Sequence, residues 1–343
     1  MGKNIYILGT TIETGNLVQN LASNFTISGV ITLKKTTDIK NISGYLNLSD
    51  LLSKYNIPVY EVDSYKLNNE KDFTLITKLR IDILIVYGWQ RLIPAWLLKH
   101  VGFAAIGVHG SPDGIMAGRG RSPQNWALIL GANKFYFSLF QLSEDIDSGK
   151  IITSSSYSIL ADDDIGTLYR KLTEESVKLI ANFLADPFSS LEFAEIQNGL
   201  AYYYPKRTAD DGAIDWRSKS ESIHNLVRAL TKPYPGAFTF YQNQKIFIWK
   251  IEKILESNST ANYEPGLIIS KKGSNDFRVS TSDGFINILE YDYESPIEIQ
   301  EGNRFTSNSE YEILGNIIER HYQTYPNLNI SPRLLNYWES LDA

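Results

Sequence analysis

The sequence predicts an α/β protein with two domains, an N-terminal domain built on a parallel sheet and a C-terminal domain that is a small β barrel. Short apolar runs alternate with stretches of helical spacing in the first half of the chain. Beyond residue 237, short β-type runs follow one another without helices between them. The chain has 343 residues, which is too long for one ordinary core and suits two domains of usual size.

The N-terminal domain is predicted from strands that alternate with helices. Residues 4–8 form an apolar run that ends at Gly9, and residues 81–86 are almost continuously apolar, which is typical of a strand covered on both faces. Further strands are expected at residues 27–33, 59–62 and 104–108, and helices at residues 14–22, 48–55, 70–79, 94–99 and 163–185. Such alternation gives a parallel sheet, which binds ligands at the carboxyl ends of its strands.

The composition changes near residues 202–207, and we expect the domain boundary there. We predict a catalytic domain at residues 1–205, a β-barrel domain at 206–295 and a helical extension at 296–343. In the second half, helices are expected at residues 222–230 and 311–322, and strands at residues 237–251, 266–270, 277–280 and 285–289.

Composition and charge exclude several classes of protein. The absence of cysteine excludes disulfides, thiolate nucleophiles and cysteine-bound metals. The net charge of −6 and the pI of about 5.4 argue against a nucleic-acid partner. No secretory signal is found, and no apolar run approaches the ~20 residues that span a bilayer. We therefore expect a cytoplasmic protein that does not bind membranes.

A histidine and an aspartate are the main candidates for chemistry. His109 follows a predicted strand and precedes a loop rich in glycine and arginine, and Asp147 lies in an acidic turn further on. A histidine can act as a base or hydrogen-bond donor near pH 7, and a carboxylate is its usual orienting partner. The alternative is that His109 is a core histidine with satisfied hydrogen bonds.

The loop at residues 118–123 contains Arg119 and Arg121 among glycines. Guanidinium groups match the oxygens of phosphates and carboxylates, so the two arginines are candidates for anion recognition; the alternative is that they are solvated loop charges. The loop lacks the glycine spacing of a dinucleotide site. The aspartates at 162–164 are better explained as helix-start charges, and no histidine has ligand spacing, so we predict no metal site.

These segments resemble the folate-dependent formyltransferases, a family that carries Asn-x-His, a loop ending in Arg-Gly-x-x-Pro, and Asp-x-Gly. The corresponding residues here are His109, the loop 119–123 and the turn 147–149. Residues 204–238 also resemble the junction between the two domains of that family, so the resemblance spans roughly residues 1–290. It implies a Rossmann-like catalytic domain that resembles the methionyl-tRNA formyltransferases and an OB-like C-terminal barrel.

Within the family, residues 109–111 and 119–126 are most similar to enzymes that formylate amino sugars linked to nucleotides. The resemblance implies N10-formyltetrahydrofolate as co-substrate, a nucleotide-linked amino sugar as acceptor, no metal, and a homodimer. It implies that His109 and Asp147 are catalytic. The pterin is expected at Val86, Tyr87, Gly88, Trp89, Glu144, Asp145 and Ile146, and the acceptor substrate at Thr10, Thr11, Ser111, Arg119 and Arg121.

One residue departs from the family pattern. Gly107 occupies the position of the family's catalytic asparagine, and glycine has no side chain to donate to an oxyanion. Asn125 is the nearest amide and our candidate replacement, although a structural role at a helix start is the alternative. Two other functions stay open: formylation of initiator methionyl-tRNA, and a degenerate homologue without activity.

Overall fold

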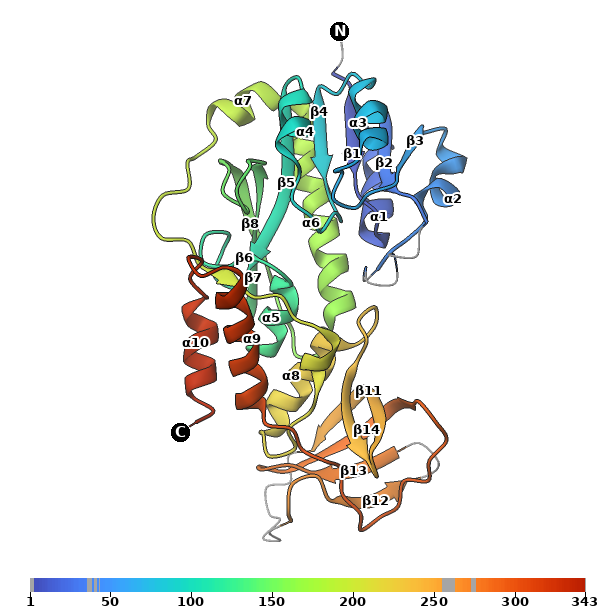
Figure 1. Ribbon diagram of the computed structural model, residues 1–343, viewed down its shortest axis with the longest axis vertical. Helices are drawn as coiled ribbons and strands as arrows, with labels where there is room; N and C mark the ends of the chain where they lie inside the picture. Colours follow the sequence, from blue (N-terminus) through green and yellow to red (C-terminus); the bar gives the residue numbers. More distant parts are fainter. Residues whose placement is uncertain are drawn as a thin grey trace. The chain divides into compact units, whose positions relative to one another are not determined.

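The computed structural model describes residues 3–35, 39, 42, 44–254, 263–272 and 276–342 (Figure 1). The chain divides into two compact units, neither of which is a single stretch of sequence. The first comprises Met1–Arg119, Tyr136–Tyr157 and Tyr169–Leu200, and the second comprises Gly120–Phe135, Ser158–Leu168 and Ala201–Ala343.

A seven-stranded sheet forms the centre of the first unit, in the order β3-β2-β1-β4-β5-β7-β8. Its strands are β1 (Ile5–Leu8), β2 (Gly29–Leu33), β3 (Val59–Val62), β4 (Ile83–Val86), β5 (Ala104–Ser111), β7 (Lys134–Gln141) and β8 (Ile151–Ser158). The first five pair in parallel, which confirms the predicted parallel sheet, whereas β7 runs antiparallel to β5. The strands β7 and β8 were not predicted from the sequence.

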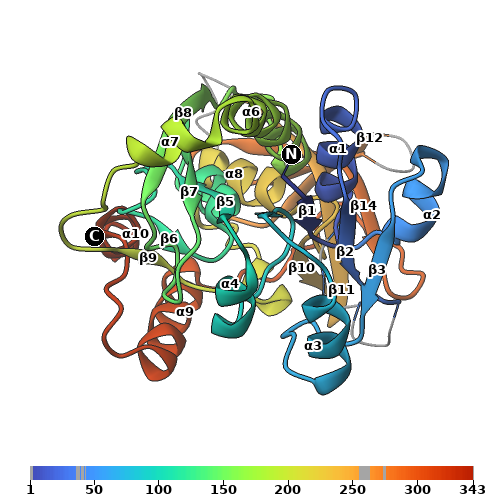
Figure 2. The same cartoon turned by 90° about the horizontal axis from the view of Figure 1, so that it is seen from above.

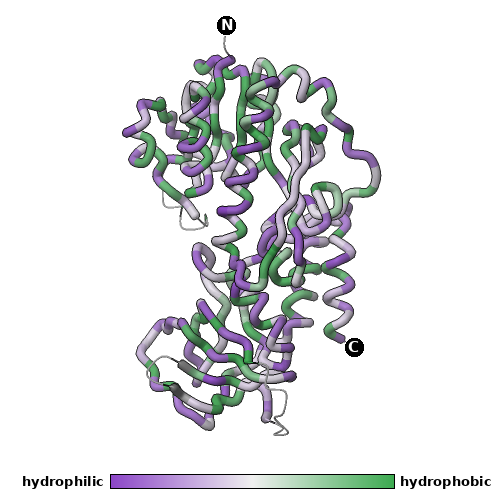
Figure 3. The backbone as a smooth tube through the Cα atoms, turned by 180° about the vertical axis from the view of Figure 1, so that it is seen from behind, coloured by the Kyte–Doolittle hydropathy of each residue, from purple (hydrophilic) through white to green (hydrophobic). Residues whose placement is uncertain are grey.

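Helices cover both faces of this sheet (Figure 2). One core cluster joins the sheet to α1 (Ile12–Leu21), α2 (Leu48–Leu52) and the later turns of α6 (Ile165–Ala185). The cluster on the other face includes α3 (Glu70–Thr77) and α4 (Ala95–His100). In Figure 3 the central strands of this unit are largely green, the colour of hydrophobic residues, as expected for strands buried on both sides. Shorter elements are η2 (Ser53–Tyr55), β6 (Arg119–Gly120) and α7 (Pro187–Glu192).

The second unit contains a five-stranded antiparallel sheet in the order β10-β11-β14-β13-β12. Its strands are β10 (Ala237–Tyr241), β11 (Gln244–Ile254), β12 (Ile268–Lys272), β13 (Asp276–Ser280) and β14 (Phe285–Tyr293). The two edge strands meet the same extended segment, because Thr306 donates to Phe240 at 2.8 Å and Ile268 donates to Asn303 at 2.9 Å. This half-barrel confirms the predicted C-terminal β domain.

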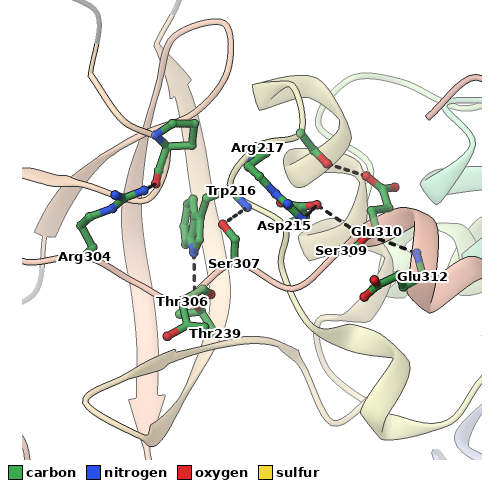
Figure 4. A network of polar contacts seen from close by, with 12 residues as sticks. Asp215, Trp216, Arg217, Thr239, Arg304, Thr306, Ser307, Ser309, Glu310 and Glu312 are labelled. Carbon is green, nitrogen blue, oxygen red and sulfur yellow. Dashed lines mark hydrogen bonds and ion pairs between the residues drawn. The ribbon is translucent and has the colours of Figure 1, made fainter. Parts of the chain in front are cut away.

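Helices complete the second unit: α5 (Pro123–Ile129), α8 (Ser220–Leu230), α9 (Glu310–Thr324) and α10 (Pro332–Glu339), with the short η3 (Ala209–Gly212) and β9 (Tyr203–Tyr204). The predicted terminal helix is confirmed as α9. Figure 4 shows how its start is held: Glu310 donates its backbone N–H to Asp215, and Ser218 donates to the Glu310 carboxylate at 2.6 Å. The α10 helix packs on α9 through stacked Tyr311 and Trp338 rings 5.0 Å apart.

Across the residues that the structure describes, no helix is long and apolar enough to cross a bilayer.

Candidate active site

His109 lies on β5, beyond the end of the neighbouring parallel strand. Val86, the last residue of β4, pairs with Gly107, so β5 continues past β4 and carries His109 to the carboxyl edge of the parallel strands. On the other side His109 pairs with Ser138 of β7. Parallel sheets bind their ligands at this edge, and the His109 side chain is 12% exposed there.

Asp147 meets His109 although the two residues are far apart in sequence. The Nδ1 atom of His109 lies 3.5 Å from Oδ2 of Asp147, and Nε2 lies 2.9 Å from the carbonyl oxygen of Gly118. A carbonyl oxygen can only accept, so Nε2 carries a hydrogen and a neutral ring has its lone pair on Nδ1. The ring thus lies between the Asp147 carboxylate at Nδ1 and the Gly118 carbonyl at Nε2.

The turn that carries Asp147 links β7 and β8. Asp147 has φ +48°, a left-handed conformation that is uncommon for a residue with a side chain. Gly149 is required, because a Cβ atom there would lie 1.7 Å from the carbonyl oxygen of Gln141. Ser148 and Ser143 add a hydrogen bond of 2.7 Å between their hydroxyls within the turn. Strain of this kind is common at functional sites.

Gln197 also contacts this site, although the sequence did not predict it. Its amide nitrogen donates to the carbonyl oxygens of Asp147 at 2.9 Å and Gly149 at 2.7 Å, and its amide oxygen accepts from Nη2 of Arg119 at 2.6 Å. Arg119 is 8% exposed, and among the described residues its Nε atom has no hydrogen-bond partner. Its neighbours in sequence include Glu195 and Asn198, so no local pattern singles out Gln197.

The residues after β4 form a buried strand end. The Tyr87 hydroxyl donates to Thr173 at 3.1 Å, and burial raises the pKa of Tyr87 to about 12. Gly88 has φ +72°, and a Cβ atom there would lie 2.3 Å from the Thr11 hydroxyl. The Trp89 ring is buried against Tyr65, and its Nε1 atom is buried without a partner in the part of the chain that is described.

Three residues predicted to contact the acceptor substrate are buried in this structure. Thr10 is 0% exposed, and its hydroxyl accepts from Thr32. Thr11 is 2% exposed, and its hydroxyl lies 3.4 Å from that of Thr14. Ser111 is also 0% exposed and donates to the carbonyl oxygen of Gly114 in a turn. Each of the three hydroxyls therefore has a hydrogen-bond partner within the protein.

The remaining predicted residues are distributed as follows. Glu144 and Asp145 are exposed and Ile146 is half-buried, all in the turn before Asp147, and Lys99 lies 3.8 Å from Glu144. Arg121 is half-buried and belongs to the second unit. No group of three histidine, aspartate or glutamate side chains within the described ranges could hold a metal ion.

Asn125 also belongs to the second unit, where its amide nitrogen donates to the carbonyl oxygen of Ala229 at 2.7 Å. Asn125 is 1% exposed. This hydrogen bond satisfies the amide nitrogen, whereas the buried amide oxygen has no partner among the described residues.

Comparisons with known proteins agree with this fold. The family profile described as "Formyl transferase" matches residues 18–184, and that described as "Formyl transferase, C-terminal domain" matches residues 206–302. Together the two profiles cover both halves of the chain in order. The chain therefore belongs to the formyltransferase family.

Individual relatives match this chain over different shares of their own length. The bifunctional polymyxin resistance protein ArnA of Wigglesworthia glossinidia brevipalpis is 33% identical over 226 residues, which is 64% of this chain and 34% of that protein. An N-formyltransferase from Helicobacter canadensis, solved with folinic acid and dTDP-3-aminofucose, has a TM-score of 0.57 at 17% identity and covers 85% of this chain and 100% of its own. HypX from Aquifex aeolicus with tetrahydrofolic acid has a TM-score of 0.58 at 17% identity, over 96% of this chain and 49% of that one. The chain thus spans about a third of ArnA and half of HypX.

Proposed function

We propose that this protein transfers a formyl group from N10-formyltetrahydrofolate to the amine of a nucleotide-linked amino sugar. The observation that carries the proposal is the pairing of His109 with Asp147, at 3.5 Å, at the carboxyl edge of the parallel strands. A formyltransferase needs a group that removes the proton of the attacking amine and an environment that tolerates the resulting charge. The pair provides both.

The chain's own groups handle the proton in this reaction. The bound folate supplies the formyl group. His109 takes at Nδ1 the proton that the amine loses as its bond to the formyl carbon forms, and gives it up to the leaving nitrogen as the old carbon–nitrogen bond breaks. Asp147 stabilises the charged ring in between, while the Gly118 carbonyl holds the opposite edge of the ring at 2.9 Å. No covalent bond to the enzyme is needed.

The strand end at residues 86–89 fits a folate. The Trp89 Nε1 donor is buried and has no partner among the described residues, which is costly unless a ligand atom accepts from it. Pterin rings carry such acceptors. We propose that Trp89, the backbone of Val86–Gly88 and the turn 144–146 hold the pterin next to His109.

The acceptor class is supported by relatives and by charge. The Helicobacter canadensis enzyme is described with dTDP-3-aminofucose, and WlaRD is described as a sugar 3N-formyl transferase in the presence of dTDP. The net charge of −6 does not favour tRNA. We propose that Arg119 and Arg121 serve the nucleotide, either by direct contact or by shaping its loop, and that the enzyme is a homodimer, as the resemblance implies.

The direct test is a panel assay. The purified protein is incubated with N10-formyltetrahydrofolate and UDP-, dTDP- or GDP-linked amino sugars, and formylated product is measured by mass spectrometry. We expect product with at least one sugar and a loss of about 10²–10⁴-fold in rate for His109→Gln. Absence of product across the panel, or full activity of His109→Gln, would contradict the proposal.

A further inference from the structure

We propose that Gln197 is a positioning residue that holds Asp147 and the segment at 118–119 on opposite edges of His109. Only the predicted effect on catalysis rests on the proposed function. The effect of Gln197 on the position of Asp147 can be tested whether or not the protein is active. Gln197 follows α7 in a segment without regular secondary structure. Its side chain reaches two separate parts of the site.

The segment around Gln197 is anchored at one point and is otherwise exposed. Glu195 and Ile151 exchange two backbone hydrogen bonds of 2.8 Å, which fix the segment at the start of β8. Within residues 195–200, every residue except Gln197 is exposed. Gln197 alone turns toward the protein, so its placement is specific and does not follow from general burial of the segment.

The hydrogen bonds of Gln197 define the orientation of its amide. Both hydrogens of the amide nitrogen are used, one toward the Asp147 carbonyl at 2.9 Å and one toward the Gly149 carbonyl at 2.7 Å. The amide oxygen accepts from the Arg119 guanidinium at 2.6 Å. The flipped amide would place an oxygen against two carbonyl oxygens and hydrogens against a cation, so only one orientation is satisfied.

The two contacts of Gln197 correspond to the two partners of His109. Asp147, which lies beside Nδ1, has its backbone carbonyl held by the amide nitrogen. Gly118, whose carbonyl lies beside Nε2, is followed directly by Arg119, which is held by the amide oxygen. One side chain therefore links the segments that contact both ring nitrogens of His109.

The Asp147 turn requires such support. With φ at +48°, Asp147 has a left-handed conformation, which is uncommon for residues with side chains although aspartate adopts it more readily than most. The amide of Gln197 holds the carbonyls on either side of Ser148, and so fixes the peptide units that set the direction of the Asp147 carboxylate. Loss of the amide donor should let the carboxylate move away from His109.

Two variants separate the donor role from simple loss of packing. Gln197→Glu keeps the shape and the acceptor for Arg119, but it removes both hydrogens and places oxygen against the two carbonyls. Gln197→Met keeps much of the volume, adds no charge and loses every hydrogen bond. Asn198→Asp is the matched control, because it adds the same charge on the neighbouring exposed side chain.

The first readout does not depend on activity. The chain has four histidines, and the His109 imidazole ¹⁵N signals are assigned by their loss in His109→Gln. In the apo protein we expect the His109 signals to shift in Gln197→Glu and Gln197→Met and to stay in place in Asn198→Asp. Unchanged His109 signals in both Gln197 variants, with thermal unfolding as a check of the fold, would overturn the proposal even if the protein proves to have another activity.

The second readout is kinetic. A misplaced catalytic group costs about 10²-fold in rate without necessarily weakening substrate binding. We expect kcat for formyl transfer to fall 10- to 100-fold in both Gln197 variants, with KM for the sugar nucleotide within about threefold of wild type. A kcat within twofold of wild type would contradict the positioning role. Inactivity of the wild type would instead contradict the proposed function, and the ¹⁵N signals would still decide whether Gln197 holds the pair.

Discussion

Gly107 sits two residues before His109, and a leucine packs over it. A Cβ atom at Gly107 would lie 3.0 Å from Cδ2 of Leu142 and 3.6 Å from the Phe140 ring. An asparagine here would therefore need the end of the Leu142 side chain to move. An amide at position 107 thus depends on the side chain at position 142 as well.

We predict that Gly107→Asn combined with Leu142→Ala raises kcat at least tenfold over Gly107→Asn alone. The paired change makes room for the amide, and one preorganised donor toward developing charge is worth about 10²–10³ in rate. Steady-state formyl transfer by the two variants, with Leu142→Ala as control, is the measurement. Equal rates for the single and paired variants would mean that another group already donates a hydrogen bond to the oxyanion.

At the level of single residues, the sequence indicated His109 and Asp147 as candidates because the motifs of the family resemblance contain them. The structure brings these two side chains together. The burial of Thr10, Thr11 and Ser111 was not predicted, because the burial of a short hydroxyl side chain depends on which segment packs against it. Gln197 was missed for a related reason. Its partners are mainly backbone carbonyls, whose positions no local pattern specifies.

At the level of elements, Asn125 links two helices of the second unit. The Ala229 carbonyl is near the end of α8, and the residue four positions on is Pro233, which has no N–H to donate. The Asn125 amide supplies the missing donor at 2.7 Å. The amide nitrogen of Asn125 therefore has a structural role in joining α5 to α8.

We predict that Asn125→Ala destabilises the protein and leaves catalysis intact. Removal of the donor leaves a buried carbonyl unsatisfied, which costs about 1–3 kcal/mol. Chemical denaturation should therefore show a lower free energy of unfolding, while kcat at a temperature where the variant is folded stays within twofold of wild type. A large loss of kcat in a stable variant would return Asn125 to the list of catalytic candidates.

His224 on α8 makes the stability of the protein depend on pH. Burial, followed by the charges of Lys253 and Arg228, lowers the pKa of His224 from 6.5 to about 4. Between about pH 6.5 and pH 4, His224 is protonated in the unfolded chain and neutral in the folded chain. Its contribution to stability is therefore fully present above pH 6.5 and is lost as the pH falls toward 4. Because His224 is only partly buried, we expect a contribution of about 1–2 kcal/mol after screening.

The measurement compares wild type with His224→Leu, which has no proton to bind. We predict that the free energy of unfolding of the wild type falls more steeply between pH 6.5 and 4 than that of the variant. Other groups titrate in this range in both proteins, so only the difference between the two slopes is informative. Parallel slopes would show that the pKa of His224 is not lowered in the folded state.

Which elements could be predicted depended on their pattern. The apolar run at 81–86 and the periodic helix at 163–185 were found because their spacing is unambiguous. The β8 strand was missed because no residue of it is fully buried, so its sequence carries little apolar signal. The segment predicted as β at 237–251 is a hairpin, β10 and β11, joined at Gln242 and Asn243, which both have positive φ.

At the scale of the whole molecule, two domains were predicted, but not that each compact unit is made of several separate stretches of the chain. The predicted boundary at residue 205 lies close to Ala201, where the last stretch of the second unit begins. The stretches 120–135 and 158–168 also belong to that unit, because α5 packs on α8 and Arg228 donates to the Leu160 carbonyl at 3.0 Å. The local amino-acid composition does not predict such contacts between residues far apart in the sequence.

The overall charge supports a prediction about partners. A chain of net charge −6 should show little counterion-driven attraction for a polyanion. We predict that initiator tRNA gives no shifted band in a gel at either 50 or 200 mM salt and does not inhibit sugar formylation. A band at low salt that vanishes at high salt would favour the methionyl-tRNA alternative.

The central claim is that His109 and Asp147 act as one unit in formyl transfer, and a double-mutant cycle tests it most directly. Rates of formyl transfer are measured for wild type, His109→Gln, Asp147→Asn and the double variant. If Asp147 acts through His109, the double variant should be no slower than His109→Gln alone, by analogy with other residues that work as a unit. Losses that multiply in the double variant, or a His109→Gln enzyme as fast as wild type, would contradict the account.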